Sequence, residues 1–153
     1  LNLRGLTESV RLLCREGMEQ SAYLLYCDLD HLKQINDYFG HLEGNYAIVA
    51  CSSILRECVR GADKLARVGG DEFVCLVLSG NPKFPDLFQA RLSAACERVN
   101  QTSGKPYYIG LSVGVQPFTL SSYEDFQRAV AEADKKLYIS KRDRRSDVRR
   151  ETE

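Results

Sequence analysis

Long hydrophobic runs, an excess of charge of one sign and closely spaced cysteine pairs are all missing from this sequence of 153 residues. A membrane-spanning helix needs about 18 consecutive apolar residues, so the first absence argues against a transmembrane segment. The 21 Lys and Arg residues balance 21 Asp and Glu residues. Such a balance is unlike that of proteins that coat nucleic acid non-specifically. We therefore expect no nucleic-acid partner and no membrane contact by this domain.

The six cysteines are too few for a disulfide scaffold, and none forms a Cys-x-x-Cys pair. Zinc-ligand spacing is thus absent. Most cysteines lie inside apolar runs, as Cys27 and Cys75 do. This placement is typical of small core residues in a reducing compartment, so we expect a cytoplasmic domain. No repeat or low-complexity linker divides the chain, and residues 1–153 are expected to form a single domain.

The spacing of apolar residues predicts the order of helices and strands. Residues 22–28 form an apolar run that ends in an acid and fits a buried central strand. Residues 64–68 and 71–78 are strand-like and are joined by two glycines, which predicts a tight β-hairpin with positive φ at the turn. Helices are expected over 6–19, 32–39, 42–60, 84–99 and 121–137, and a further strand over 107–115, ended by Pro117. This order predicts an α/β (α+β) sandwich, with helices packed on a mixed central sheet.

Two acidic pairs stand at strand ends. Asp28 and Asp30 follow the first predicted strand, where acids often line a ligand site, although either acid would also suit a helix cap. Asp71 and Glu72 follow the glycines; they suit a solvated turn, but the apolar run after them favours a working edge of the sheet. If these strands pair antiparallel, Asp28 meets Asp71, and converging carboxylates suit Mg²⁺. Regular alternation would point Asp71 and Glu72 to opposite faces.

Polar residues around the short helix offer a second kind of chemistry. Lys33 near the start of that helix would suit an anion, and the amides of Asn36 and Asn45 can pair with a base edge. These residues also fit an ordinary polar surface around Gly40. The chain end is basic, with six Lys or Arg against two Asp over residues 141–150. That end fits either a solvated helix terminus or a phosphate-binding edge.

Together these motifs resemble the GGDEF domain of bacterial diguanylate cyclases, over residues 22–146. The hallmark is Arg-Val-Gly-Gly-Asp-Glu-Phe at residues 67–73. Four further blocks stand in the expected order: residues 27–37, residues 38–41 with Gly44, Ser-Val-Gly-Val at 112–115, and Ala-Asp-Lys-Lys-Leu-Tyr at 133–138 with Lys141. The resemblance implies the fold of nucleotidyl cyclase and polymerase palm domains. It also implies condensation of two GTP into cyclic di-GMP with release of pyrophosphate.

The resemblance further implies a set of site residues. Mg²⁺ or Mn²⁺ would be held by Asp28, the Leu29 carbonyl, Asp71 and Glu72, with the last two as catalytic residues. Substrate would be bound by main-chain amides near His31 and Leu32, by Lys33, Lys141 and Arg145 at the phosphates, and by Asn36 at guanine. Each protomer would hold one GTP, so catalysis would need a homodimer.

Arg60 and Asp63 form an Arg-x-x-Asp motif before the hairpin. At this spacing the resemblance implies an inhibitory site, where cyclic di-GMP binds and keeps two active sites apart. Arginine pairs with phosphate or guanine, and a carboxylate accepts guanine N–H groups. The alternative is an ordinary ion pair at a helix end. Because the family usually carries an N-terminal sensory or receiver region, we expect this domain to be cut from a longer protein.

Three departures from the family pattern leave other functions open. Asn45 stands where the family usually has aspartate, and a mismatched hydrogen bond to guanine costs about 1–3 kcal/mol. This substitution leads to the hypothesis of a weakened preference for GTP, with some tolerance of ATP. The N-terminal family signature is reduced to Leu-Arg-Gly-Leu at residues 3–6, and Arg144 replaces a glycine. A non-catalytic domain that senses GTP or cyclic di-GMP is therefore the competing interpretation.

Overall fold

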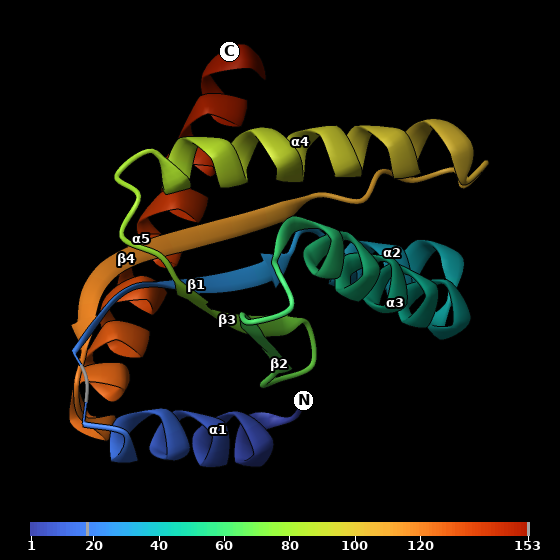
Figure 1. Cartoon of the computed structure of the whole chain (residues 1–153). Coiled ribbons are helices and arrows are strands. Elements are labelled where there is room, and N and C mark those ends of the chain that lie inside the picture. Colours follow the sequence, from blue (N-terminus) through green and yellow to red (C-terminus); the bar gives the residue numbers. More distant parts are fainter. Residues whose placement is uncertain (18, 153) are drawn as a thin grey trace.

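The computed structural model describes the backbone of residues 1–17 and 19–152 and the side chains of residues 1–17 and 19–142. These residues form five helices and four strands (Figure 1). In chain order they are α1 (Leu3–Arg15), β1 (Gln20–Leu29), α2 (Leu32–Phe39), α3 (His41–Cys58), β2 (Lys64–Arg67), β3 (Glu72–Leu78), α4 (Phe84–Thr102), β4 (Leu111–Leu120) and α5 (Tyr123–Thr152). The predicted order of elements and the α/β fold class are confirmed.

The strands form one sheet in the order β2-β3-β1-β4, and each neighbouring pair is antiparallel. The expectation of a mixed sheet is therefore wrong for the named strands. The physical reason lies in the connections: α2 and α3 return the chain so that β2 runs in the direction of β1, but one place removed from it. The hairpin then inserts β3 between them, and every direct neighbour runs the opposite way.

Apolar residues on the two faces of the sheet build two cores. Leu25 and Cys27 of β1 pack on one face with side chains of α2, α3 and α4. Leu24 packs on the other face with α1 and α5, because successive strand residues alternate. Four of the six cysteines, Cys27, Cys51, Cys58 and Cys75, are buried, as predicted. None of the helices described by the structure combines the length and apolar character that a membrane span requires.

The expected end of the last strand is wrong. The strand β4 runs through Pro117, which pairs with Tyr23 of β1, instead of ending before it. Because β4 is an edge strand, proline removes no hydrogen bond from a central ladder. Ser122 caps α5: its N–H donates to Asp125 Oδ2 at 3.1 Å, and the Asp125 N–H donates to Ser122 Oγ at 3.3 Å.

A glycine lets α5 approach the sheet closely. A Cβ atom on Gly114 of β4 would lie 2.1 Å from the Ala133 carbonyl oxygen and 2.6 Å from Leu137 N. Only a residue without a side chain permits this approach. The same helix continues to Lys141, whose ammonium contacts Asp28 at the end of β1. The close packing of α5 on β4 therefore helps to bring Lys141 to Asp28.

The N-terminal residues lie beside the hairpin. The Leu1 carbonyl accepts a hydrogen bond from Arg67 N at 3.1 Å, and Asn2 forms an isolated parallel bridge with Arg67. Asn2 also caps α1, because its Oδ1 accepts from Gly5 N at 2.8 Å. This segment, which keeps only part of the family signature, is thereby fixed to the last residue of β2.

Candidate active site

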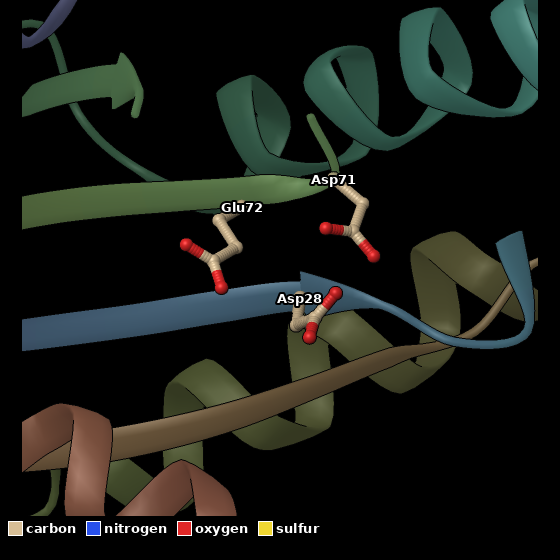
Figure 2. A group of neighbouring side chains, drawn as sticks. All are labelled: Asp28, Asp71 and Glu72. Atoms are coloured by element: carbon tan, nitrogen blue, oxygen red, sulfur yellow. The ribbon is translucent and has the colours of Figure 1, made fainter. Parts of the chain in front are cut away.

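Three acids converge where β1 ends and the hairpin turns. Asp28 pairs with Glu72 across the β1–β3 ladder, and Asp71 immediately precedes β3. One carboxylate oxygen from each acid lies within 4.8 Å of the others, and Figure 2 shows the three side chains pointing toward one another. We call Asp28, Asp71 and Glu72 the acidic corner. The predicted meeting of Asp28 and Asp71 is confirmed, whereas the role of these acids as metal ligands stays a prediction.

Asp71 and Glu72 do not point to opposite faces, as regular strand alternation predicted (Figure 2). The reason is that β3 begins at Glu72, so Asp71 belongs to the turn and the alternation does not apply to it. Its main chain is fixed from the neighbouring strand, because the Asp71 carbonyl accepts from Leu29 N at 3.0 Å. Both acids are thus available to one ligand.

The turn that carries Asp71 is held by an arginine. Arg67 donates from Nε to the Gly69 carbonyl at 3.1 Å and from Nη2 to the Gly70 carbonyl at 2.8 Å. Neither glycine has positive φ, so the expected tight two-residue turn is wrong. The loop is longer, and it closes with a bond from Val68 N to the Glu72 carbonyl at 3.0 Å. In the sequence Arg67 is only the first residue of the hallmark, and nothing there indicates this role in the turn.

Asp28 lies in the most unusual environment of the three acids. It is 9 % exposed, and its Oδ1 is buried without a hydrogen-bond partner among the described residues. Burial raises the pKa of Asp28 to about 6; the contact with Lys141 opposes this shift and the neighbouring Asp71 adds to it. An unpartnered buried oxygen is costly unless a ligand satisfies it. The acidic corner therefore fits a hard divalent cation, which prefers carboxylate oxygens.

Tyr26 is a neighbour that the sequence did not reveal. Its hydroxyl donates to Glu72 Oε2 at 2.9 Å, and burial together with Glu72 raises the pKa of this hydroxyl. Tyr26 therefore stays protonated and orients one carboxylate of the acidic corner. Because it stands inside the apolar run of β1, no pattern in the sequence distinguishes it from a core residue.

Asp30 does not join the acidic corner. Its Oδ1 accepts from Ser112 Oγ at 2.6 Å, and its N–H donates to the Gly110 carbonyl at 2.9 Å, so it ties the end of β1 to the start of β4. Neither Asp28 nor Asp30 caps α2. His31 occupies the cap position with φ of 62° and without a side-chain cap bond. The first N–H groups of α2 are thus left without a side-chain acceptor.

The remaining predicted substrate residues lie on α2, α3 and α5. Lys33 is exposed in the first turn of α2. The Asn36 amide lies against α3 so closely that a Cβ on Gly44 would be 1.7 Å from its Oδ1, and the exposed Asn45 follows Gly44. The structure thus brings Asn36 beside the segment that carries Asn45. Arg145 falls in α5, but its side chain lies outside the described residues.

A groove of about 570 Å³ lies on the other side of the hairpin. We call it the arginine groove, because Arg56, Arg60 and Arg67 line it together with Asp63. Asp63 Oδ2 accepts from Arg60 N at 2.8 Å, and its Oδ1 accepts from Leu78 N at 3.3 Å. No side-chain ion pair between Arg60 and Asp63 occurs in the part of the chain with described side chains. Instead, the carboxylate joins the α3–β2 turn to the end of β3.

The comparisons with known proteins agree with this geometry. A family model described as "Diguanylate cyclase, GGDEF domain" matches residues 1–147, and the chain belongs to this family. Diguanylate cyclase A of Treponema denticola is 30% identical over 131 residues, which are 85% of this chain and 35% of that protein. The chain thus spans about a third of the length of this relative.

Solved structures show the same fold. Diguanylate cyclase SiaD of Pseudomonas aeruginosa, solved with its activator SiaC, matches with a TM-score of 0.79 and 26% identity over 93% of this chain and 55% of that one. The GGDEF domain of DgcB from Caulobacter crescentus, solved with c-di-GMP, matches with a TM-score of 0.73 and 23% identity over 92% of this chain and 85% of that one.

Proposed function

We propose that this domain is a diguanylate cyclase that condenses two GTP molecules into cyclic di-GMP and releases pyrophosphate. The observation that carries the proposal is the acidic corner, where three carboxylates converge at a strand end and a glycine turn. Membership of the GGDEF family supports this reaction class. The buried, unpartnered Oδ1 of Asp28 supports a cation-binding role for the corner, with Mg²⁺ or Mn²⁺ as the cofactor.

In this proposal the acidic corner and the Leu29 carbonyl hold the metal ions. The chemistry that Mg²⁺ supplies at such a site is activation of a 3′-hydroxyl and neutralisation of charge on the phosphoryl oxygens. Asp71 and Glu72 act as the catalytic residues, because their carboxylates would hold the ions that act on the reacting phosphate. Tyr26 and Arg67 act as positioning residues, since one orients Glu72 and the other fixes the turn before Asp71.

The substrate lies between the helix start and the basic helix α5. Lys33, Lys141 and Arg145 bind the triphosphate, together with main-chain amides near His31 and Leu32. The uncapped start of α2 supports this arrangement, because first-turn N–H groups and the helix dipole favour an anion. Asn36 binds the guanine, and Asn45 lies beside it.

Each protomer holds one GTP, whose 3′-hydroxyl attacks the α-phosphate of the GTP in the partner. Two new phosphodiester bonds form and two pyrophosphates leave, so the reaction needs a homodimer with facing sites. Cyclic di-GMP then binds at Arg60 and Asp63 in the arginine groove and holds the two active sites apart. Support for this product inhibition is the motif and its place in a groove that three arginines line.

The test is release of pyrophosphate from GTP and Mg²⁺ by the wild-type domain, compared with Asp71→Asn. We expect release by the wild type and a loss of at least about 100-fold in the variant, because a metal-bound carboxylate acts in the transition state. Asp37→Asn, an exposed acid on α2, is the matched control and should retain activity. A folded dimer that binds GTP or cyclic di-GMP without releasing pyrophosphate would instead establish the non-catalytic sensor.

A second candidate keeps the reaction but relaxes the choice of base. The observation that favours it is Asn45, exposed beside the Gly44 surface on which the Asn36 amide lies. Two amides present donors as well as acceptors, a set that also pairs with adenine. Incubation with Mg²⁺ and mixed GTP and ATP tests this idea by the products formed. Products that contain guanine alone would refute it.

A further inference from the structure

Lys141 joins the acidic corner from the far end of the chain. Its Nζ contacts Asp28 Oδ2, across 113 residues of sequence. The Lys141 side chain is 30% exposed and the Asp28 side chain 12%, so water screens the pair only partly. Because Lys141 contacts Asp28, its ammonium is a cation placed at the same acids that suit a divalent ion.

The contact sets Lys141 and a metal ion in competition. A divalent cation at the acidic corner would use the carboxylate of Asp28, because this acid is the most buried of the three and has an unpartnered oxygen. With Asp28 also bound by an ammonium, two cations would share one carboxylate. Like charges so close repel strongly. Binding of a metal ion at Oδ1 therefore disfavours the contact of Lys141 with Oδ2 of Asp28.

A triphosphate offers the displaced lysine a new partner. The Lys141 side chain is 30% exposed, and its ammonium stands on a flexible four-carbon stem that can turn from a carboxylate to a phosphate. Metal alone then binds at the cost of the Lys141–Asp28 pair. Metal together with nucleotide binds without that loss, because the phosphates replace the carboxylate.

We propose that Lys141 is the counter-ion of the metal-free acidic corner and exchanges Asp28 for phosphate when metal and nucleotide bind together. The inference rests on the proposed function, since it takes the acidic corner as the metal site and a nucleoside triphosphate as the ligand. Its consequence is a positive coupling between metal and nucleotide binding, which by linkage must be equal in both directions. The exchange also makes metal binding by the nucleotide-free domain weaker than binding in the presence of nucleotide.

The test measures Mn²⁺ binding without turnover, from the electron paramagnetic resonance signal of free Mn²⁺. Without nucleotide, Lys141→Gln should bind Mn²⁺ roughly three- to tenfold more tightly than the wild type, because the competing pair is gone. Lys141→Arg keeps the charge and should restore the weak binding. Lys135→Gln is the matched control, since Lys135 pairs with Glu132 on the same helix away from the corner, and its Mn²⁺ affinity should be unchanged.

A non-hydrolysable GTP analogue tests the exchange itself. In the wild type the analogue should tighten Mn²⁺ binding more than it does in Lys141→Gln, where no lysine is released. A measurement on the wild type needs no variant: acetylation of Lys141, followed by mass spectrometry, should be slow in the free domain. It should be faster with Mn²⁺ alone and slow again with Mn²⁺ and the analogue.

Equal or weaker Mn²⁺ binding by Lys141→Gln without nucleotide, or acetylation of Lys141 that Mn²⁺ leaves unchanged, would overturn the exchange. These failures differ from failure of the proposed function. If the wild type releases pyrophosphate and Asp71→Asn loses Mn²⁺ binding, the metal site stands and only the exchange falls. If neither the wild type nor any variant binds Mn²⁺, both fall.

Discussion

The acidic corner and the arginine groove flank the same hairpin and use their aspartates in opposite ways. Asp28 in the corner is buried and has an oxygen without a partner. Asp63 in the groove is partly exposed, and both of its oxygens accept backbone N–H groups. An unsatisfied acid is held ready for a ligand, whereas a satisfied acid already stabilises the fold. A motif aspartate therefore has to be judged by its hydrogen bonds as well as by its place in the sequence.

The largest expected effect is the pH dependence of stability that Asp28 causes, and it tests the contrast between the two aspartates most directly. Its pKa is raised from 3.8 in the unfolded chain to about 6, so the folded state binds the proton more tightly. The stabilising contribution is present below pH 4 and is lost as the pH rises through 6. The loss is about 3 kcal/mol.

Urea unfolding of the metal-free domain between pH 4 and 7 measures this contribution, with Asp28→Asn as the comparison. The asparagine of this variant cannot ionise, so the free energy of unfolding of the variant should change less with pH over this window than that of the wild type. The affinity of the wild type for Mn²⁺ should fall about tenfold for each pH unit below 6, because protons compete with the metal for the Asp28 carboxylate. The same pH dependence in both proteins would show that the pKa of Asp28 is not raised by folding.

Removal of the Asp63 carboxylate should have the next largest effect. Asp63→Ala leaves Arg60 N and Leu78 N without their acceptor, which costs about 1–3 kcal/mol. Arg60→Ala removes an exposed side chain, and its effect on the free energy of unfolding should stay within about 0.5 kcal/mol. Urea unfolding of the two variants checks this contrast. Equal stability of Asp63→Ala and wild type would mean that the bonds from Asp63 to Arg60 N and Leu78 N do not stabilise the fold.

The same pair of variants separates a structural role from a ligand role in the groove. Arg60→Ala should lose cyclic di-GMP affinity while it keeps its stability. Asp63→Asn retains one acceptor and should be intermediate in stability. If Arg60→Ala binds cyclic di-GMP as the wild type does, the proposed inhibitory site is refuted, whatever the stability of Asp63→Ala.

Arg67 lines the groove and also holds the turn of the corner, so its replacement should affect both regions. Arg67→Gln removes two hydrogen bonds to exposed carbonyls, which costs about 1 kcal/mol of stability. We expect kcat for pyrophosphate release to fall more than KM rises, because the turn positions Asp71 and does not bind the base. Arg67→Lys should rescue little, since lysine lacks the planar pair of donors. A change in KM alone would contradict a positioning role.

The smallest effect is expected for Tyr26→Phe. The variant loses one hydrogen bond to Glu72 Oε2, worth about 0.5–1.5 kcal/mol, and keeps the packing of the ring. Pyrophosphate release should fall severalfold, with stability nearly unchanged. Tyr108→Phe, at an exposed tyrosine, is the control that should behave as wild type. A loss as large as that of Asp71→Asn would mean that Tyr26 takes a direct part in the reaction.

Much of the fold was predictable from patterns that depend on near neighbours in the chain. The apolar runs and the two glycines predicted β1 and the hairpin, and the meeting of Asp28 and Asp71 was expected on the condition that β1 and β3 pair antiparallel. The mixed sheet and the end of β4 at Pro117 were predicted wrongly, because the place of a strand in a sheet depends on contacts between distant segments. Proline is acceptable in β4 only because that strand is at the edge.

The site was predictable in its acids but not in their partners. Tyr26 resembles every other apolar position of β1, and the double role of Asp63 appears only when its oxygens are seen on Arg60 N and Leu78 N. Asp71 was expected to point away from Glu72, and this expectation was wrong for a local reason. The strand β3 begins one residue later, at Glu72, so Asp71 belongs to the turn. Hydrogen-bond partners far along the chain leave no periodic signal in the sequence.

The bridge between the N-terminal residues and the hairpin has a mechanical consequence. Leu1 and Asn2 are bonded to the backbone of Arg67, and the side chain of that residue grips the two glycine carbonyls ahead of Asp71. A displacement of Leu1 would therefore move Arg67, and through its side chain the turn that carries Asp71. Arg67 connects the N-terminal residues to the acidic corner.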